Sequence, residues 1–243
     1  MIVNVTTVLW DIDGTLLRTP GFGVRAFDRA LVLVSGRSIP RDRPYDFGGK
    51  TDPLIAVELL DAVGLLHRSE ELVPVMLAEV ELAYAEDVDQ LCTTIRVLPG
   101  VPELLAAWHE RGTHQSVVTG NLEYVARCKL AAGALDAHLD LASGGYGSDH
   151  PERVELVRLA MARSARTVPI ECSTTWIIGD TPRDASCAAA AGVRCLLVAT
   201  GTYPVDALMG LGADAVLTDL TDTGHVLSLV ADPGLIHDDR VGR

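Results

Sequence analysis

Residues 3–16 read VNVTTVLWDIDGTL and place two aspartates directly after an apolar run. The run Val3–Trp10 predicts a buried strand, because its apolar residues follow one another with little interruption. Asp11 and Asp13 stand two positions apart in extended backbone, so their side chains project to the same side. Neighbouring carboxylates repel each other unless a cation joins them, and Mg²⁺ prefers such oxygen ligands. The stretch therefore predicts a metal-assisted site at the end of a strand.

A second pair of acids follows another apolar run. Thr174–Ile178 again has the pattern of a buried strand, and Asp180 and Asp184 come after it. Ligands bind at the carboxyl ends of the strands in open α/β sheets, so Asp180 would lie beside Asp11 if the two strands are neighbours. A cap at a helix N-terminus is the alternative interpretation of Asp180 or Asp184. Four acids at two strand ends favour a shared site over two separate caps.

A third segment of interest ends the run Gln115–Thr119. Here Thr119 is followed by Gly120 and Asn121. A hydroxyl group and a glycine amide at a strand end, ahead of a helix, can bind an anion. The segment also fits an ordinary strand-to-helix turn in which Asn121 caps the next helix. It predicts an anion site only in combination with the two acidic pairs.

Strand and helix patterns alternate from residue 98 onward, which predicts an α/β fold with a parallel sheet covered by helices. The predicted strands are Val3–Trp10, Gln115–Thr119, His138–Ala142, Thr174–Ile178, Cys195–Ala199 and the weaker Ala215–Leu217. The helices predicted among them are Gly100–Arg111, Glu123–Ala132, Pro151–Arg163 and Pro182–Ala191.

The region between residues 19 and 92 differs, because it has no convincing strand pattern. Its helical stretches are Val24–Leu33, Asp52–Ala62 and Glu70–Glu86. The region follows the first strand and precedes the rest of the sheet. We therefore expect a helical insert that lies over the carboxyl-terminal edge of the sheet.

Within this insert, residues 47–52 read FGGKTD and contain Lys50, one of only two lysines in the chain. Gly49, Lys50 and Thr51 could present a cation and backbone amides to the distal part of a substrate. The alternative interpretation is a flexible turn followed by a helix that begins with Thr51 or Asp52 as its N-cap. The sequence supports the two interpretations equally.

Length and composition limit the possible functions. The chain has 243 residues, of which 48% are apolar, and its net charge is −13. This length fits one large α/β domain, with or without an insert, and the negative charge argues against nucleic acid as a partner. No apolar run is long enough to span a membrane, and the first residues lack the basic start of a secretory signal. The number of cysteines is five, which is odd, and no two of them have C-x-x-C spacing. We therefore expect free thiols in a soluble, cytoplasmic protein.

The three motifs, in this order, resemble those of the haloacid dehalogenase-like (HAD) superfamily. The family pattern is Asp-x-Asp-Gly-Thr, then Ser/Thr, then Lys/Arg, then Gly-Asp-x-x-x-Asp, and the resemblance runs from Val8 to about Gly201. It implies a Rossmann-like core made of residues 1–18 and 96–243. It also implies that residues 19–95 form the small helical cap of subclass I, as in phosphoglycolate phosphatase-like proteins.

The residue two places after the first aspartate distinguishes branches of this family. True dehalogenases have Tyr and phosphonatases have Ala where this chain has Asp13. The resemblance therefore implies a phosphatase acting on a small phosphorylated metabolite, of the phosphoglycolate or sugar phosphate kind. A phosphomutase of the β-phosphoglucomutase type and a non-catalytic regulatory domain are alternatives, and a 2-haloacid dehalogenase is disfavoured by Asp13. The protein is expected to be a monomer or a homodimer.

The third family motif departs from the usual pattern. A lysine followed by proline is usual, whereas residues 147–153 read GSDHPER and contain no lysine. Arg153 is the candidate for the phosphate-binding cation, although its offset from the helix differs from that of the lysine. His150 or a residue of the cap could share this role.

The resemblance also assigns roles to the acids. Asp11 would be the nucleophile that forms an aspartyl-phosphate, and Asp13 would act as general acid and then as general base. Mg²⁺ would be bound by the Asp11 and Asp180 carboxylates and the Asp13 backbone carbonyl, with Asp184 acting directly or through water. The phosphate-binding residues would be Thr119, Gly120, Asn121 and Arg153.

Overall fold

The computed structural model describes residues 5–41 and 45–231 and contains the predicted parallel sheet. Its strands are β1 (Thr7–Trp10), β4 (His114–Thr119), β5 (Gly145–Tyr146), β6 (Thr175–Gly179), β7 (Arg194–Val198) and β8 (Ala215–Leu217). They are arranged in the order β5-β4-β1-β6-β7-β8, and every neighbouring pair is parallel. Residues 3 and 4 of the predicted first strand lie outside the described residues.

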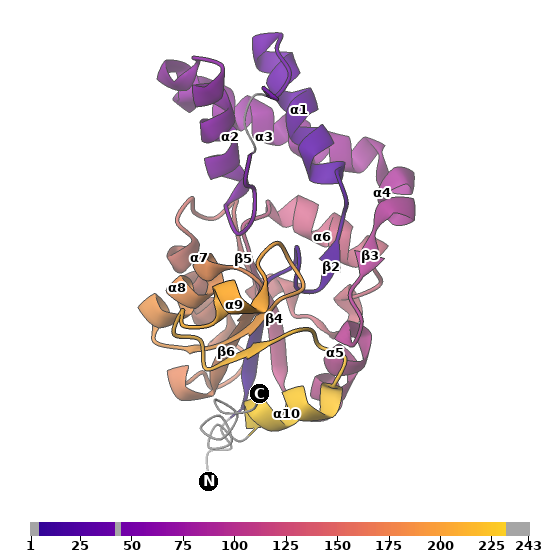
Figure 1. Ribbon diagram of the computed structural model, residues 1–243, viewed down its shortest axis with the longest axis vertical. Helices are drawn as coiled ribbons and strands as arrows, with labels where there is room; N and C mark the ends of the chain where they lie inside the picture. The colour runs from indigo at the N-terminus through magenta and orange to yellow at the C-terminus, as the bar shows by residue number, and fades with distance from the viewer. Residues whose placement is uncertain (1–4, 42–44, 232–243) are drawn as a thin grey trace.

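Successive side chains of each central strand are buried on opposite faces of the sheet. In β1, Leu9 belongs to one apolar cluster, whereas Val8 and Trp10 belong to another. Helices cover both faces (Figure 1). The Trp10 side is covered by α5 (Val101–Glu110) and α10 (Thr223–Ala231), and the Leu9 side by α7 (Arg153–Ser164) and α8 (Pro182–Ala191). Burial on both faces explains why the strand sequences are almost continuously apolar.

The strand register aligns the motifs that carry the acids. Trp10 of β1 pairs with Val117 of β4 on one side and with Ile178 of β6 on the other. The next residue, Asp11, donates its amide hydrogen to the Ile178 carbonyl oxygen over 2.9 Å. The segments that follow these three strands therefore leave the sheet at the same edge. Asp180, the first residue after β6, lies there beside Asp11. The predicted adjacency of the two acid-bearing strands is confirmed.

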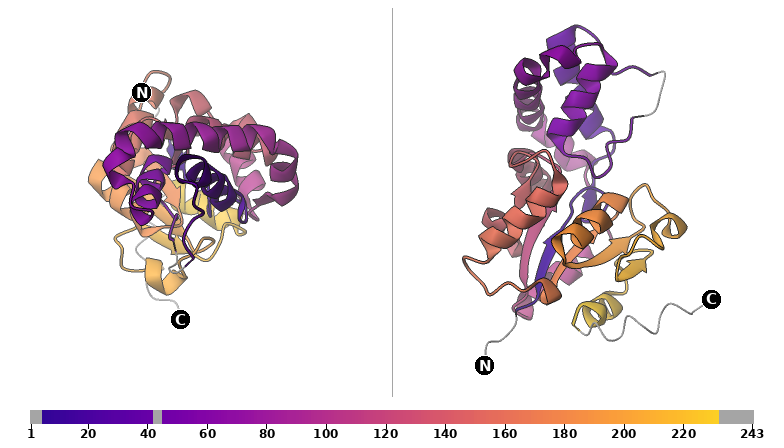
Figure 2. Two further views of the ribbon diagram at one scale, coloured as in Figure 1. Left: turned by 90° about the horizontal axis from the view of Figure 1, so that it is seen from above. Right: turned by 90° about the vertical axis from the view of Figure 1, so that its left-hand side faces the viewer.

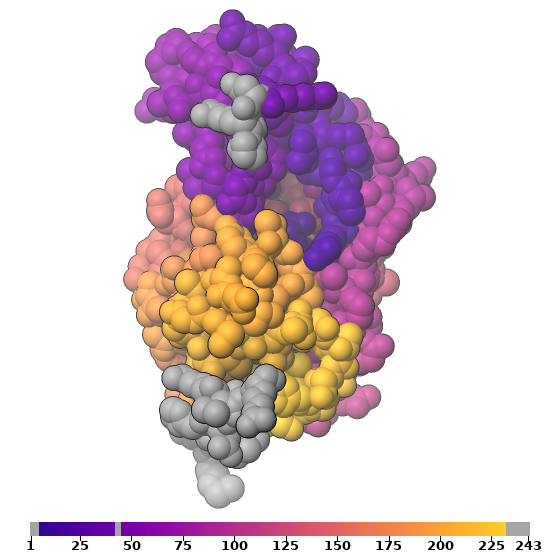
Figure 3. Space-filling view, viewed as in Figure 1, coloured from indigo at the N-terminus to yellow at the C-terminus, as the bar shows by residue number. Residues whose placement is uncertain are grey.

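Between β1 and α5 the chain forms a helical layer, defined here as residues 22–41 and 45–94. It contains α1 (Phe22–Ser35), α2 (Asp52–Ala62), α3 (Ser69–Glu86) and α4 (Val88–Thr94). These helices bury their own apolar cluster, to which Leu122 and Val125 add. The layer stands over the carboxyl-terminal edge of the sheet (Figure 2), and in the space-filling view it forms the upper part of the molecule (Figure 3). The three helices predicted in this region are present, and the division of the chain into two domains stays a prediction.

Two short strands connect the helical layer to the sheet. β2 (Leu17–Arg18) precedes the layer and β3 (Arg96–Val97) follows it. They pair in an antiparallel manner, with Leu17 opposite Val97. The entering and leaving segments therefore lie side by side, so the chain enters and leaves the layer through one two-stranded ribbon.

The prediction of a strand at His138–Ala142 was wrong. This segment forms two short 3₁₀ turns on either side of Leu139, and the edge strand β5 comes later and has two residues. The Asp140 carboxylate accepts hydrogen bonds from the Ala142 amide (3.2 Å) and the Ser143 hydroxyl (2.5 Å). These local bonds compete with strand pairing. A run of five residues with apolar members does not by itself distinguish a strand from such turns.

The cysteines agree with the expectation from their spacing, because all five are free. Cys187 and Cys195 are buried in the Leu9 cluster. In the described parts of the chain, none of the helices is both long and apolar enough to cross a membrane.

Truncating a core leucine should destabilise the protein much more than truncating a surface leucine. Leu196 of β7 is fully buried, whereas Leu33 of α1 is 60% exposed. We expect Leu196→Ala to lower the free energy of unfolding by about 2–5 kcal/mol, because it leaves a cavity in the sheet. The matched Leu33→Ala change should alter it by less than about 0.5 kcal/mol. Urea denaturation measures both, and equal losses would contradict the described core.

Candidate active site

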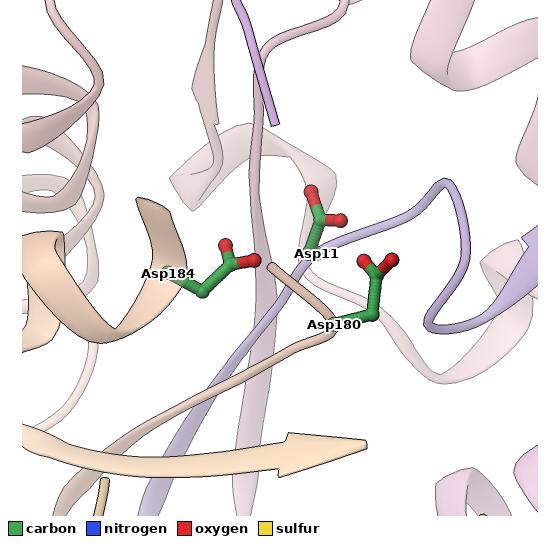
Figure 4. Close-up of side chains that lie close together, drawn as sticks. All are labelled: Asp11, Asp180 and Asp184. Carbon is green, nitrogen blue, oxygen red and sulfur yellow. The ribbon is translucent and has the colours of Figure 1, made fainter. Parts of the chain in front are cut away.

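Three carboxylates converge at the edge of the sheet under the helical layer. One oxygen each of Asp11, Asp180 and Asp184 lies within 4.8 Å of the other two, and the three side chains point toward one another (Figure 4). Their relative exposures are only 4%, 3% and 1%. A compact set of carboxylate oxygens is the type of donor set that hard divalent cations such as Mg²⁺ prefer. These residues could therefore hold a metal ion.

Two glycines allow the backbone to pass directly against Asp180. An added Cβ would lie 1.6 Å from Asp180 Oδ2 at Gly201 and 2.4 Å from it at Gly14. Gly14 also has a φ of +88°, a region that other residues rarely adopt. The Thr15 hydroxyl then donates to Asp180 Oδ1 over 3.2 Å. The Gly-Thr part of the first motif therefore positions the acid of the last motif.

Asp184 belongs both to the acid cluster and to a helix cap. Pro182 starts α8, and the Thr181 amide and hydroxyl donate to Asp184 Oδ2 over 3.0 and 2.7 Å. The other oxygen, Oδ1, faces the cluster and accepts from Arg153 over 2.5 Å. A carboxylate in the first turn is stabilised by the helix dipole. Asp184 therefore belongs to the capping box of α8 and also lies beside Asp11 and Asp180, while its role toward a metal stays a prediction.

Arg153 reaches from the first turn of α7 into the centre of the acid cluster. Its Nη2 donates to Asp11 Oδ1 over 2.7 Å and to Asp184 Oδ1 over 2.5 Å, and its side chain is 7% exposed. Its Nε is buried and has no hydrogen-bond partner among the described residues. A buried donor of this kind is normally satisfied by a ligand or water. His150, by contrast, accepts from the Glu152 amide.

The electrostatics of the cluster show an excess of negative charge. Burial, followed by the charges of Asp11 and Asp184, raises the pKa of Asp180 to about 9. Burial also raises the pKa of Asp11 to about 6, although the Arg153 guanidinium acts in the opposite direction. Asp11 and Asp180 thus stay protonated to higher pH than an ordinary aspartate does. A divalent cation would stabilise their ionised forms and would bind in competition with these protons.

Asp13 lies next to the cluster, but its carboxylate has a different partner. Its Oδ2 accepts from Lys129 Nζ over 2.6 Å, and its side chain is 42% exposed. Lys129 also donates to Asn121 Oδ1 over 2.8 Å. Although burial opposes the charged form, the nearby Asp13 charge raises the pKa of Lys129. This lysine is therefore a charged group inside the site.

The sequence analysis did not identify Lys129, although one signal was present. Lys129 lies on the same face of α6 (Glu123–Ala132) as the buried Val125 and Ala126, and it is itself only 4% exposed. A rare lysine on the apolar face of an amphipathic helix requires a buried partner. The identity of that partner depended on the fold.

The segment Thr119-Gly120-Asn121 lines the same site, but Asn121 does not cap α6. The residue that precedes α6 is Leu122, and it makes no side-chain cap. The side-chain oxygen of Asn121 accepts a hydrogen bond from Lys129 instead. The backbone N–H of Asn121 donates to Thr119 Oγ1 over 3.2 Å. The capping interpretation of Asn121 was therefore wrong, because its side chain turns into the site.

The loop Gly48–Thr51 of the helical layer contacts the sheet edge closely. Arg153 Nη1 donates to the Gly49 carbonyl oxygen over 3.4 Å, and the Thr51 hydroxyl donates to the Pro151 carbonyl oxygen over 2.9 Å. Thr51 is also the N-cap of α2, as one interpretation predicted. Lys50 lines the site, but its ammonium group pairs with Glu58 over 2.6 Å. The loop thus combines a cap with a wall of the site.

A cavity of about 500 Å³ lies between the helical layer and the sheet edge. Its floor contains Asp11, Asp13, Asp180, Thr119, Gly120, Asn121, Lys129 and Arg153. Its upper wall is mainly apolar and includes Phe27, Phe47, Ile55, Val80 and Tyr84. This size and this mixture of convergent polar groups and apolar walls are typical of a site for a small molecule.

Asp52 is a further buried acid that links the helical layer to the sheet. Its amide donates to the Gly120 carbonyl oxygen over 2.7 Å, and its Oδ2 accepts from the Leu122 amide over 2.8 Å. Burial raises the pKa of Asp52 to about 7, with Lys129 acting in the opposite direction. The folded protein therefore binds this proton more tightly than the unfolded chain, in which the pKa is near 3.8.

The raised pKa of Asp52 predicts a pH dependence of stability. Between about pH 4 and pH 7 the folded state binds more protons than the unfolded state, so the contribution of Asp52 to the free energy of unfolding decreases as pH rises. We expect Asp52→Asn to be relatively more stable at pH 8 than at pH 5, each compared with wild type. Urea denaturation at both pH values tests this, with the exposed Asp61→Asn as control. An unchanged difference between the two pH values would contradict it.

Comparisons with known proteins agree with this geometry. A family model described as haloacid dehalogenase-like hydrolase matches residues 8–189. The chain is 30% identical to the probable phosphatase IndB of Dickeya dadantii over 227 residues, which cover 90% of this chain and 94% of that protein. It is 26% identical to a plasmid phosphoglycolate phosphatase of Cupriavidus necator over 215 residues, covering 88% and 90%.

Solved structures show the same fold. The crystal structure of a predicted phosphatase from Clostridium acetobutylicum has a TM-score of 0.71 at 19% identity, and the match covers 93% of this chain and all of that chain (100%). The strand order, the acid cluster and the family match lead to one conclusion. This chain belongs to the haloacid dehalogenase-like hydrolase family.

Proposed function

We propose that this hydrolase is a phosphatase that cleaves a small phosphate monoester through an aspartyl-phosphate intermediate. The observation that carries the proposal is the position of Asp11, whose buried carboxylate faces both Arg153 and the acids Asp180 and Asp184. A nucleophilic carboxylate that attacks an anionic phosphate needs positive charge around it. The curated relatives described above, which are named as phosphatases, support the same reaction.

In the first step, Asp11 attacks phosphorus, and the bond between phosphorus and the leaving oxygen breaks. Asp13 donates a proton to that leaving oxygen. In the second step, Asp13 takes a proton from water, the water oxygen attacks the phosphorus of the aspartyl-phosphate, and inorganic phosphate leaves as Asp11 is restored. Transfer of the phosphoryl group to water is what distinguishes this reaction from that of a phosphomutase.

The other residues of the site would bind the phosphoryl group. Arg153 has a buried Nε without a partner in the described structure, and this donor suits a phosphoryl oxygen. Thr119 and the Gly120 amide lie at the same strand end and line the cavity. Mg²⁺ bound by Asp11, Asp180, Asp184 and the Asp13 backbone carbonyl would offset the repulsion between the nucleophile and the phosphate.

The helical layer would act as a cap that encloses the substrate. Its aromatic and aliphatic side chains form the wall of the cavity opposite the acids, so closure would exclude bulk water while Asp11 attacks, before the hydrolytic water enters for the second step. On this basis residues 19–95 form the cap, and residues 1–18 and 96–243 form the core. A cavity of about 500 Å³ suits a substrate of the phosphoglycolate or sugar phosphate kind. Gly49, Lys50 and Thr51 would contribute to the choice among such substrates.

Replacing the nucleophile should abolish the reaction. We expect Asp11→Asn to lower kcat for hydrolysis of p-nitrophenyl phosphate by on the order of 10³-fold or more, because an amide cannot form the acyl phosphate. The matched control is Asp206→Asn, an exposed aspartate outside the cavity. Release of inorganic phosphate measures the rate. An Asp11→Asn enzyme with near-normal turnover would exclude the proposed mechanism.

Removing the metal, or one of its proposed ligands, should also stop the reaction. We expect chelation by EDTA to abolish phosphate release and added Mg²⁺ to restore it. Asp180→Asn should weaken Mg²⁺ binding by about 10-fold or more, since even loss of a group that only supports a ligand has such an effect. Calorimetric titration of the substrate-free protein with Mg²⁺ measures this directly. Equal Mg²⁺ affinity in wild type and variant would remove Asp180 from the metal site.

A further inference from the structure

Asp11 and Asp13 are two residues apart, yet their carboxylates lie in different surroundings. Asp11 is almost fully buried and belongs to the three-acid cluster. Asp13 is 42% exposed in its side chain, and its carboxylate is not part of that cluster. Among the described residues, Lys129 is the single hydrogen-bond partner of the Asp13 carboxylate. The lysine therefore determines where the second acid points.

Lys129 is itself held firmly from several sides. Its Nζ donates to Asp13 Oδ2 over 2.6 Å and to Asn121 Oδ1 over 2.8 Å. The ammonium group lies 5.8 Å from the ring centre of Tyr84, which comes from α3 of the helical layer. Tyr84 is 1% exposed and Lys129 is 4% exposed. The ammonium group therefore contacts residues that follow the strand ends on one side and Tyr84 of the helical layer on the other.

The burial of the Lys129 ammonium group is unfavourable, and the surrounding groups must offset its free energy. A buried ammonium group is unfavourable unless hydrogen bonds and opposite charges compensate for the lost water. Here the buried Asp52 adds an opposite charge nearby, but the carboxylate that forms the hydrogen bond belongs to Asp13, whose side chain is 42% exposed and lines the cavity. An arrangement of this kind adds little to stability, but it limits the directions available to a side chain at the site.

We propose that Lys129 is a positioning residue that holds the Asp13 carboxylate on the leaving-group side of the cavity, apart from the three-acid cluster. The inference rests on the proposed phosphatase function, in which Asp13 transfers a proton to the leaving oxygen. Such a transfer requires the acid to lie within hydrogen-bond reach of that oxygen. Without Lys129, the carboxylate would rotate freely toward solvent, and productive contacts with the leaving oxygen would become rare. Contact of Tyr84 with Lys129 would make this alignment depend on closure of the helical layer.

The inference makes a specific statement about which substrates suffer when Lys129 is lost. In an ester such as p-nitrophenyl phosphate the leaving group is weakly basic, so it departs without needing a proton. Phenyl phosphate has a similar shape, but its leaving oxygen is more basic and needs protonation in the transition state. A defect in the alignment of Asp13 therefore slows formation of the aspartyl-phosphate from the second ester far more than from the first. Hydrolysis of the aspartyl-phosphate, in which Asp13 also takes part, is common to both esters. A general loss of folding or of phosphate binding slows both esters equally.

The experiment compares Lys129→Met with wild type on these two esters at saturating Mg²⁺. The quantity compared is kcat/KM, because it reports the first step, in which the leaving group departs, and not the hydrolysis of the aspartyl-phosphate that both esters share. We expect kcat/KM to fall by less than about 3-fold for p-nitrophenyl phosphate and by on the order of 10²-fold for phenyl phosphate, within the range typical of general acid catalysis. Asp13→Asn serves as the reference and should show the same imbalance. The control is Arg127→Met, which removes an exposed cation of the same helix and should leave both rates unchanged.

Two results would overturn the inference while leaving the phosphatase function intact. One is an equal loss of kcat/KM on both esters in Lys129→Met, and the other is a wild-type pattern of kcat/KM in Lys129→Met beside an imbalance in Asp13→Asn. If wild type releases phosphate from neither ester, the proposed function itself fails. Thermal unfolding by circular dichroism checks that the variants are folded. If Lys129→Met does not fold, Lys129→Gln is measured in its place, with the same expected imbalance.

Discussion

The structure depends on the repulsion among three buried carboxylates that meet at one end of the sheet. Asp11, Asp180 and Asp184 lie close enough to share one cation and are almost without contact to solvent. Such a group is unfavourable when all three acids are ionised, because each charge then loses its water and faces two like charges. The fold offsets part of this cost with the Arg153 guanidinium and with the N-terminus of α8. The remaining excess of negative charge is what makes the site suited to a metal ion.

Close packing around the site requires glycine at several positions of the surrounding backbone. Gly14 and Gly201 have no side chain where Asp180 needs room. At Gly120 an added Cβ would lie 1.9 Å from the Lys50 carbonyl oxygen, so glycine is also required where the helical layer touches the strand end. The glycines of the site therefore have a common physical cause. Each one lies where two segments must approach more closely than a Cβ permits.

The helical layer contacts the strand ends and the proposed active site at two places. Through Asp52 it forms hydrogen bonds to the backbone at Gly120 and Leu122, so it is joined to the strand end that lines the cavity. Through Tyr84 it contacts the ammonium group that binds Asp13. Two acids in one short motif thus have different partners: one faces a cluster that demands a cation, and the other faces a cation that the protein itself supplies. This difference supports the roles proposed for the two acids, attack on phosphorus for Asp11 and proton transfer for Asp13.

The sequence by itself determined the class of fold, most of the secondary structure and the main acids of the site. Buried parallel strands require continuous apolar runs, and an acid directly after such a run must appear at the carboxyl end of the sheet. The order of the motifs was also sufficient to indicate the family, because spacing along the chain is a property of the sequence. The local signals failed where short-range hydrogen bonds competed with strand pairing, as at Asp140.

Only the tertiary structure decided which cations meet which acids. Arg153 was a candidate from the sequence, but its contacts to Asp11 and Asp184 depend on how α7 packs against the sheet. Lys129 and Asp13 are 116 residues apart in the chain and 2.6 Å apart in space. A periodic pattern shows which face of a helix is buried, but it does not show what lies opposite that face. The partner of a buried charge is therefore set by packing between distant segments, and this is information that no local stretch of sequence contains.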